Sequence, residues 1–169
     1  MQWGTRGSGN GQFECPYDVA VDGSGYVYVV ELFNHRVQKF TIGGGYVTKW
    51  GTQGSGNGQF NHPHGVAVYA GGLVYVTDYL NNRIQVFTAN GAYVMQWGTQ
   101  GSGDGQLDGP VGVAVDGGGN VYVTERHSNR IQVFTGSGAY VTQWGTQGGG
   151  DGQFLEPYAV AVDAAGYVY

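Results

Sequence analysis

Charged residues, and basic ones above all, are scarce in this sequence. Only 11% of its 169 residues are charged, only seven are Lys or Arg, and the formal net charge is −5. A surface that binds nucleic-acid phosphates or anionic lipids needs clustered basic side chains. We therefore expect no nucleic-acid partner and no membrane partner.

Cysteine and long apolar runs are scarce as well. The single cysteine, Cys15, excludes a disulfide within one chain and leaves the compartment open. No apolar run approaches the length of a membrane span, and the opening "MQWGTRG" lacks the features of a signal peptide. We therefore expect no transmembrane segment and no signal peptide within this sequence.

Glycine and aromatic residues are abundant, and both recur at a fixed spacing. There are 34 glycines, 13 tyrosines and four tryptophans. The stretch "WGTQGSGNGQFNHPHGVAV", which begins at Trp50, returns in similar form 47 residues later at Trp97 and again at Trp144. A period of this size indicates either propeller blades or helical pairs.

The pattern inside one repeat favours blades. Residues 65–68, 73–78, 83–88 and 92–98 are short runs rich in Val, Ile, Tyr, Phe and Trp, separated by Gly and Asn turn signals. Four strands per repeat predict an all-β propeller of four-stranded antiparallel blades. The second strand should be buried on both faces and the third should alternate. The Trp that ends the fourth should cover the seam between blades.

These boundaries predict a single domain that spans the chain. Three complete blades are expected at about residues 17–50, 64–97 and 111–144, and a partial blade at about 158–169. Propellers close with about four to eight blades, and open blade faces invite aggregation. We therefore expect the ring to be closed by oligomerisation, with a homodimer favoured, unless this chain is a piece of a longer protein.

The motif "PHGVAV…VYVTDYLNNRIQVF" resembles the NHL repeat, and each full repeat of the chain carries it. The resemblance implies a β-propeller, usually of six blades, and does not fix an activity. Six blades are thus the favoured number for the closed ring, and eight are the alternative.

An acidic residue ends each predicted second strand, and an arginine opens each third strand. Because five residues separate them across a hairpin, we expect a charge-assisted ion pair in every blade, with a structural role. The three pairs are Glu31 with Arg36, Asp78 with Arg83, and Glu125 with Arg130.

Two loops of each repeat vary in chemistry while the framework hardly changes. They precede the first strand and join the second to the third, so they share one end of the blade. The other end has small turns such as "DGSG" and is expected to be plain. The varied face is the predicted ligand-binding site, with the candidates Tyr17, Phe33, His35, His62, His64, Tyr79, Arg126, His127 and Tyr158.

The "HPH" at 62–64 raises the question of a metal site, since histidine is a common zinc ligand. In the amidating-lyase propellers, zinc is held by histidines of different blades near the axis, and His64 resembles one of them. The equivalent residues here are Tyr17, Val111 and Tyr158, which departs from that pattern. We predict no metal, no cofactor and no catalytic residue.

The favoured function is therefore a non-enzymatic scaffold or binding module for a peptide, protein or glycan. The alternative is a propeller-type lyase or lactonase with an axial metal site. Two further readings stay open: RNA binding, which some NHL proteins perform through a basic face and which the acidic balance disfavours, and a self-assembling fragment without a selected activity.

Overall fold

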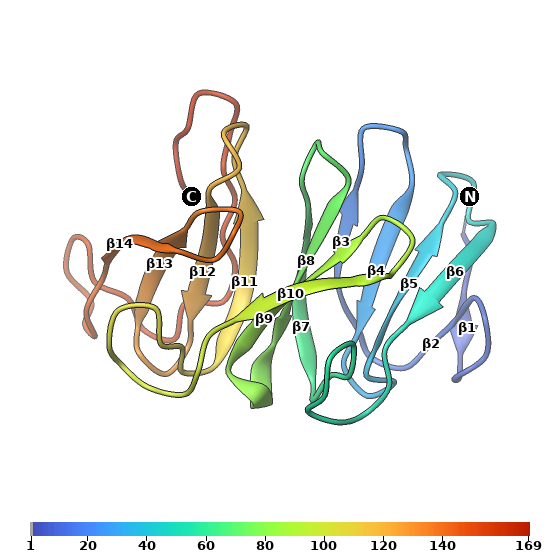
Figure 1. Cartoon of the computed structure of the whole chain (residues 1–169), viewed down its shortest axis with the longest axis horizontal. Helices are drawn as coiled ribbons and strands as arrows, with labels where there is room; N and C mark the ends of the chain where they lie inside the picture. Colours follow the sequence, from blue (N-terminus) through green and yellow to red (C-terminus); the bar gives the residue numbers. More distant parts are fainter. Residues whose placement is uncertain (1) are drawn as a thin grey trace.

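The structure is a computed structural model that describes residues 2–169, and it consists of three four-stranded antiparallel sheets side by side (Figure 1). Each sheet is a meander in chain order, which confirms the predicted blades. The first is β3 (Pro16–Val21), β4 (Val27–Glu31), β5 (Arg36–Phe40) and β6 (Tyr46–Trp50). The second is β7 (Pro63–Val68), β8 (Leu73–Asp78), β9 (Arg83–Thr88) and β10 (Tyr93–Trp97). The third is β11 (Pro110–Val115), β12 (Val121–Glu125), β13 (Arg130–Phe134) and β14 (Tyr140–Trp144).

Smaller elements accompany the three blades. β1 (Thr5–Arg6) pairs in parallel with β2 (Gln12–Phe13) within the glycine-rich loop that precedes the first blade. A single 3-10 turn, η1 (Tyr79–Asn81), follows β8. In the fourth repeat Val162 and Val168 form an isolated antiparallel bridge, so this repeat begins a hairpin where the sequence predicts a partial blade. Within residues 2–169 no helix has the length and apolar character needed to cross a membrane.

The first strands of neighbouring blades lie against one another, and this places them innermost. β7 contacts both β3 and β11. The hydroxyl of Thr77 accepts a hydrogen bond from the Gly65 amide at 2.7 Å and donates one to the Val111 carbonyl at 2.8 Å, which ties the second blade to the third. The three blades therefore form part of a ring around an axis lined by the strands β3, β7 and β11.

The core fills the seams between blades. The second strand β4 is buried throughout, as the sequence predicts. The third strand β9 alternates as expected, since Ile84 and Val86 pack in the seam with the third blade while Phe87 packs in the seam with the first. Both of its faces are buried, from Ile84 to Phe87. Gln85 is the polar one among them. Its amide nitrogen donates to the Gln59 carbonyl at 2.6 Å and so holds the preceding glycine-rich loop against the blade.

The Trp that ends the outer strand packs across a seam in the first and second blades. Trp50 of the first blade lies 5.8 Å from Phe87 of the second, between ring centroids, and Trp97 lies at the same distance from Phe134 of the third. A Cβ added at Gly91, where φ is +85°, would come within 2.6 Å of the Trp50 ring. Glycine is required in that turn, because the indole occupies the space of a side chain and the backbone is left-handed.

All three acid–arginine pairs form, and all three are buried. The shortest distances are 2.5 Å for Arg36 with Glu31, 2.7 Å for Arg83 with Asp78 and 2.5 Å for Arg130 with Glu125. Each guanidinium also donates to carbonyl oxygens of the preceding glycine-rich loop; Arg83, for example, reaches Ser55, Gly56 and Gln59 at 2.7, 2.9 and 2.9 Å. The pair thus anchors the glycine-rich loop to the blade.

A side-chain latch joins each loop after the second strand to the next repeat. The residue in this loop with left-handed φ is Asn82 in the second blade and Asn129 in the third, and each amide oxygen accepts a backbone N–H 27 residues further on, at 2.9 and 2.8 Å. In the first blade His35 holds this place, and its Nδ1 accepts the His62 amide at 3.2 Å. His35 can make this bond only while Nδ1 carries no proton.

Replacing His35 with Asn is expected to flatten the acid side of the pH–stability profile. Burial, followed by the neighbouring His62, lowers the pKa of His35, against a smaller opposite effect of Asp78. The unfolded chain then binds the proton more tightly than the folded one. The stability from this group is present above the ordinary histidine pKa of about 6.5 and is lost as the pH falls through the depressed folded pKa.

Thermal melting between pH 7.5 and about 5 measures the effect, since His titrates in this window. His35→Asn should lose less stability on acidification than the wild type. The matched variant Asn82→His, which builds the same latch in the next seam, should lose more. Equal pH profiles for all three proteins would show that the latch does not titrate.

Candidate axial binding site

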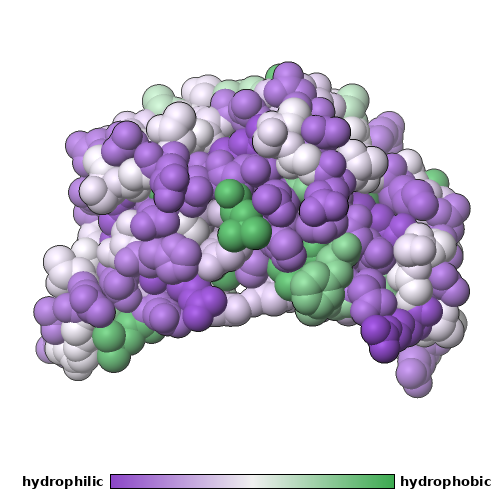
Figure 2. Space-filling view, turned by 90° about the horizontal axis from the view of Figure 1, so that it is seen from below, coloured by the Kyte–Doolittle hydropathy of each residue, from purple (hydrophilic) through white to green (hydrophobic). Residues whose placement is uncertain are grey.

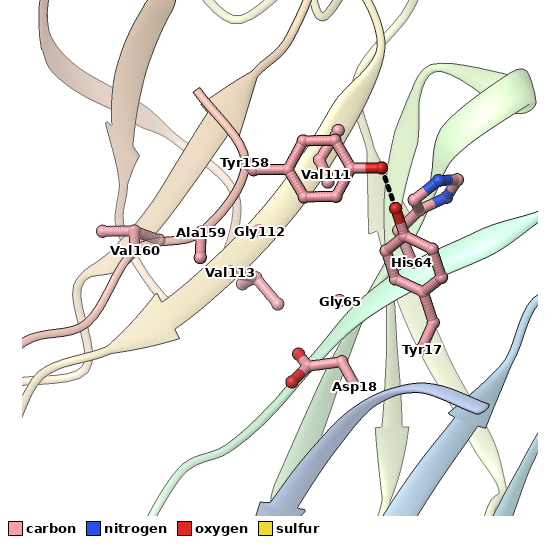
Figure 3. Close-up of a pocket in the computed structure, with 10 residues that line it drawn as sticks. All are labelled: Tyr17, Asp18, His64, Gly65, Val111, Gly112, Val113, Tyr158, Ala159 and Val160. Carbon is pink, nitrogen blue, oxygen red and sulfur yellow. Dashed lines mark hydrogen bonds between the residues drawn. The ribbon is translucent and has the colours of Figure 1, made fainter. Parts of the chain in front are cut away.

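Four equivalent positions of successive repeats converge near the axis. Tyr17, His64, Val111 and Tyr158 stand 47 residues apart in the chain and line one pocket of about 140 Å³. The pocket is completed by the neighbouring residues of the same inner strands and of the fourth repeat. These are Asp18, Gly65, Gly112, Val113, Ala159 and Val160 (Figure 3).

The hydroxyl groups of Tyr17 and Tyr158 meet across this pocket (Figure 3). Their ring centroids are 6.0 Å apart, although 141 residues separate them in the sequence. Burial, followed by the hydrogen bond with Tyr158, raises the pKa of Tyr17 above its ordinary value. The Tyr17 phenol is therefore neutral at pH 7 and can donate to an acceptor placed between the two hydroxyl groups.

His64 is buried between two tyrosine rings. Its ring centroid lies 4.3 Å from that of Tyr17 and 4.4 Å from that of Tyr79, and the residue is 7% exposed. Nδ1 lies 2.8 Å from the His62 carbonyl, which can only accept, so Nδ1 carries the proton and Nε2 is an acceptor. Burial lowers the pKa of His64 and keeps the imidazole neutral.

A charged and hydrogen-bonded rim surrounds the third-blade side of the pocket. The guanidinium of Arg126 pairs with Glu156 at 2.7 Å and lies 5.7 Å from the centroid of the Tyr158 ring. The hydroxyl of Tyr79 bonds His127 Nε2 at 3.1 Å. The candidates Tyr17, His64, Tyr79, Arg126, His127 and Tyr158 thus form one connected group, the axial cluster.

The other three candidates form a second group at the seam between the first two blades. His62 packs its ring 5.0 Å from that of His35 and 5.9 Å from that of Phe33, between centroids. Phe33 is 55% exposed, whereas the Nδ1 of His35 is occupied by the latch. The sequence-based set therefore divides into an axial cluster and a peripheral aromatic group.

Two participants were absent from the sequence-based set. The Asp108 carboxylate accepts from His127 Nδ1 at 3.2 Å, and Glu156 holds Arg126. Both are acidic residues in the varied loop before a first strand. Their charge, opposite to that of basic candidates in the other varied loop, was the signal that could have identified them. Within residues 2–169 no group of three or more His, Cys, Asp or Glu side chains is arranged to hold a metal ion.

The loop face is hollowed along its concave edge and is mostly hydrophilic, with separate apolar patches (Figure 2). Large exposed apolar side chains in its loops are Phe33, Leu80 and Leu155. Their separation argues against one continuous apolar docking surface.

Blades of four antiparallel strands, arranged side by side around an axis, define a β-propeller architecture. Residues 60–87 and 107–134 match the NHL repeat family, so the second and third blades carry NHL repeats, as the motifs predict. No curated protein matches the chain in sequence.

Solved structures share the fold at low sequence identity. Hydrazine synthase of Kuenenia stuttgartiensis is 16% identical with a TM-score of 0.68, over 89% of this chain and 40% of that one. A chain of a nidogen/laminin complex is 22% identical with a TM-score of 0.67, over 89% and 53%. Virginiamycin B lyase of Staphylococcus aureus is 19% identical with a TM-score of 0.62, over 86% and 45%. The chain spans about half of each protein, and the likeness concerns the fold alone.

Proposed function

We propose that this chain is a non-enzymatic β-propeller binding module that takes a peptide or protein at the axial cluster. The observation that carries the proposal is the convergence of positions 17, 64, 111 and 158 on one pocket. Three of these positions bear rings, and the hydroxyl groups of Tyr17 and Tyr158 meet beside the buried His64 ring. Aromatic side chains with a few placed polar groups favour capture of one partner side chain.

Selection of a random peptide library on the immobilised protein tests this proposal. Selected peptides should lose at least tenfold in affinity on Tyr158→Ala and on His64→Ala. Ile42→Ser, which changes a 73% exposed residue outside the axial cluster, is the control and should leave affinity unchanged. Peptides that bind all four proteins equally would contradict an axial site. If the protein bound glycans instead, and this binding also depended on His64, the ligand of the axial cluster would be a sugar and not a peptide.

The enzyme alternative is tested by the same His64→Ala variant. Zinc content after purification should be equal in the variant and the wild type if the chain is a binding module. A zinc ion that is present in the wild type and lost in the variant would favour the propeller-type lyase or lactonase.

A second proposal is that two copies of the chain close one ring. Val19 and Val21 on the first blade are 58% and 55% exposed. The equivalents of Val19, Val66 and Val113, are only 3% and 6% exposed in the internal seams, and those of Val21, Val68 and Val115, are partly buried there. In those seams the occupant is the preceding blade of the same chain. The exposed face therefore matches a blade face of this protein, and head-to-tail contact of two copies satisfies both open ends.

A further inference from the structure

A second cavity lies on the opposite face, where the sequence predicts only plain turns. It encloses about 410 Å³ between the first and second blades. Its walls are the β3–β4 turn, the β7–β8 turn and the turn after β9, at the edge away from the loop face (Figure 1). The residues that line it are Asp22, Gly23, Ser24, Tyr26, Lys39, Tyr69, Ala70, Gly72 and Ala89. We call it the turn-face cavity.

Lys39 brings a buried positive charge to this cavity. The residue is 5% exposed, and its Nζ donates to the Ala89 carbonyl at 3.0 Å. The ammonium lies 4.1 Å from the ring centroid of Tyr26 and 5.1 Å from that of Tyr28. No carboxylate of the described residues pairs with it within 4.0 Å. A buried charge without a direct ion pair is costly, because rings and one carbonyl replace water only in part.

The internal repeats show that this charge is a departure from the framework. The equivalents of Lys39 are Val86 and Val133, both buried apolar residues that fill the same part of their seams. An apolar side chain is therefore sufficient for the fold at this position. The lysine calls for another explanation.

A second departure lines the same cavity. The equivalents of Tyr69 are Asp22, Asp116 and Asp163, and each aspartate accepts backbone N–H groups of its own turn. Tyr69 therefore stands where the other repeats have a carboxylate, and it lines the same cavity as Lys39. Lys39 of the first blade and Tyr69 of the second, which both differ from their equivalents, thus line one cavity.

Together the exceptions change the local charge by two units. The seam between the third and fourth repeats has Asp116, Val133 and Asp163, with a summed charge of −2. The first seam has Asp22, Lys39 and Tyr69, with a sum of zero. Burial alone would raise the pKa of Asp22, but hydrogen bonds from Tyr26, Tyr28 and Ser24 and the charge of Lys39 hold that pKa below its ordinary value. Asp22 is therefore ionised, and its oxygens are already in use.

We propose that the turn-face cavity binds a small aromatic carboxylate, with the carboxylate group against Lys39 and the ring among Tyr26, Tyr69 and the glycines of the turns. The volume is within the range of small-molecule sites, about 300–1,000 Å³. A ligand carboxylate supplies the direct ion-pair partner that Asp22, whose oxygens are bonded elsewhere, does not give Lys39, and such charge-assisted hydrogen bonds are strong. This site is separate from the axial cluster and does not depend on the function proposed for it.

Calorimetric titration with three probes tests the proposal. 4-Hydroxybenzoate has the ring and the charge, 4-hydroxybenzamide has the ring without the charge, and sulfate has charge without a ring. The wild type should bind 4-hydroxybenzoate at least tenfold more tightly than either of the other two. Lys39→Val and Tyr69→Asp, which restore the residues of the other repeats, should each weaken that binding at least tenfold.

Lys49→Val, on an exposed part of β6, is the matched control and should leave binding unchanged. Lys39→Val should also raise the melting temperature without ligand, because valine fills this position in two other blades. That result confirms that loss of binding does not arise from unfolding. The proposal is wrong if 4-hydroxybenzoate fails to bind the wild type at millimolar concentration, or binds Lys39→Val equally well. If 4-hydroxybenzamide bound as tightly as 4-hydroxybenzoate, the charge would have no role. If sulfate bound as tightly as 4-hydroxybenzoate, the ring would have none.

Discussion

Replacing Arg83 with Met is expected to destabilise the chain by about 3–5 kcal/mol, the usual cost of breaking a buried ion pair from one side. Asp78 is fully buried, and the variant leaves its carboxylate without the guanidinium at 2.7 Å. The carbonyl groups of Ser55, Gly56 and Gln59 lose a donor at the same time. Urea denaturation followed by tryptophan fluorescence measures the loss.

Two companion variants show where the loss originates. Arg6 and Glu14 form an ion pair in which the arginine side chain is 86% exposed, so Arg6→Met should give no measurable change. Arg83→Lys keeps the charge but cannot reproduce the planar set of donors, and should recover only part of the stability. If Arg83→Met were as stable as Arg6→Met, the pair would not hold the glycine-rich loop in place.

The double variant Val19→Asp and Val21→Asp is expected to reduce the solution mass from that of two chains to that of one. Carboxylates at these positions would be desolvated by a second copy packed on the open face of the first blade, and each would oppose assembly. Because both valines are more than half exposed in a single chain, the substitutions should leave the fold of that chain intact. Light scattering on a size-exclusion column measures the mass.

The matched control is Val94→Asp, on the outer strand of the second blade, where the residue is 45% exposed. This variant should keep the mass of the wild type. A wild-type mass equal to one chain would overturn the proposed homodimer. A wild-type mass of two chains that survives the double variant would place the contact on another face.

The open face and the turn-face cavity both lie where the first blade differs from its internal repeats. Equivalent residues in the other seams show what a framework position needs, which is valine at 86 and 133 and a buried valine at 66 and 113. Lys39 departs from its equivalents in chemistry, and this departure led to the proposed ligand site. Val19 is a valine like its equivalents and differs from them only in its exposed fraction, which is the basis for proposing a second copy against it.

Much of the blade could be predicted from sequence, because its determinants are local and recur. The fixed period identified equivalent residues, and alternating apolar runs with glycine turns determined four strands per repeat. Glu31 and Arg36 could be paired in advance, since a hairpin brings residues five apart together. The alternation of Ile84 and Val86 with Phe87 in β9 could also be predicted. The burial of Gln85 could not, because it depends on the glycine-rich loop, whose Gln59 carbonyl accepts from the Gln85 side chain.

The convergence of sites was decided by the tertiary structure. Tyr17 and Tyr158 meet only because the curvature of the blade row brings the first and fourth repeats to one axis. Likewise, three turns from two blades enclose Lys39 only because neighbouring blades pack at one angle and distance. The sequence determined which residues are equivalent, since that depends on spacing along the chain. Which of them touch depends on how blades stack in space, and no local pattern encodes that geometry.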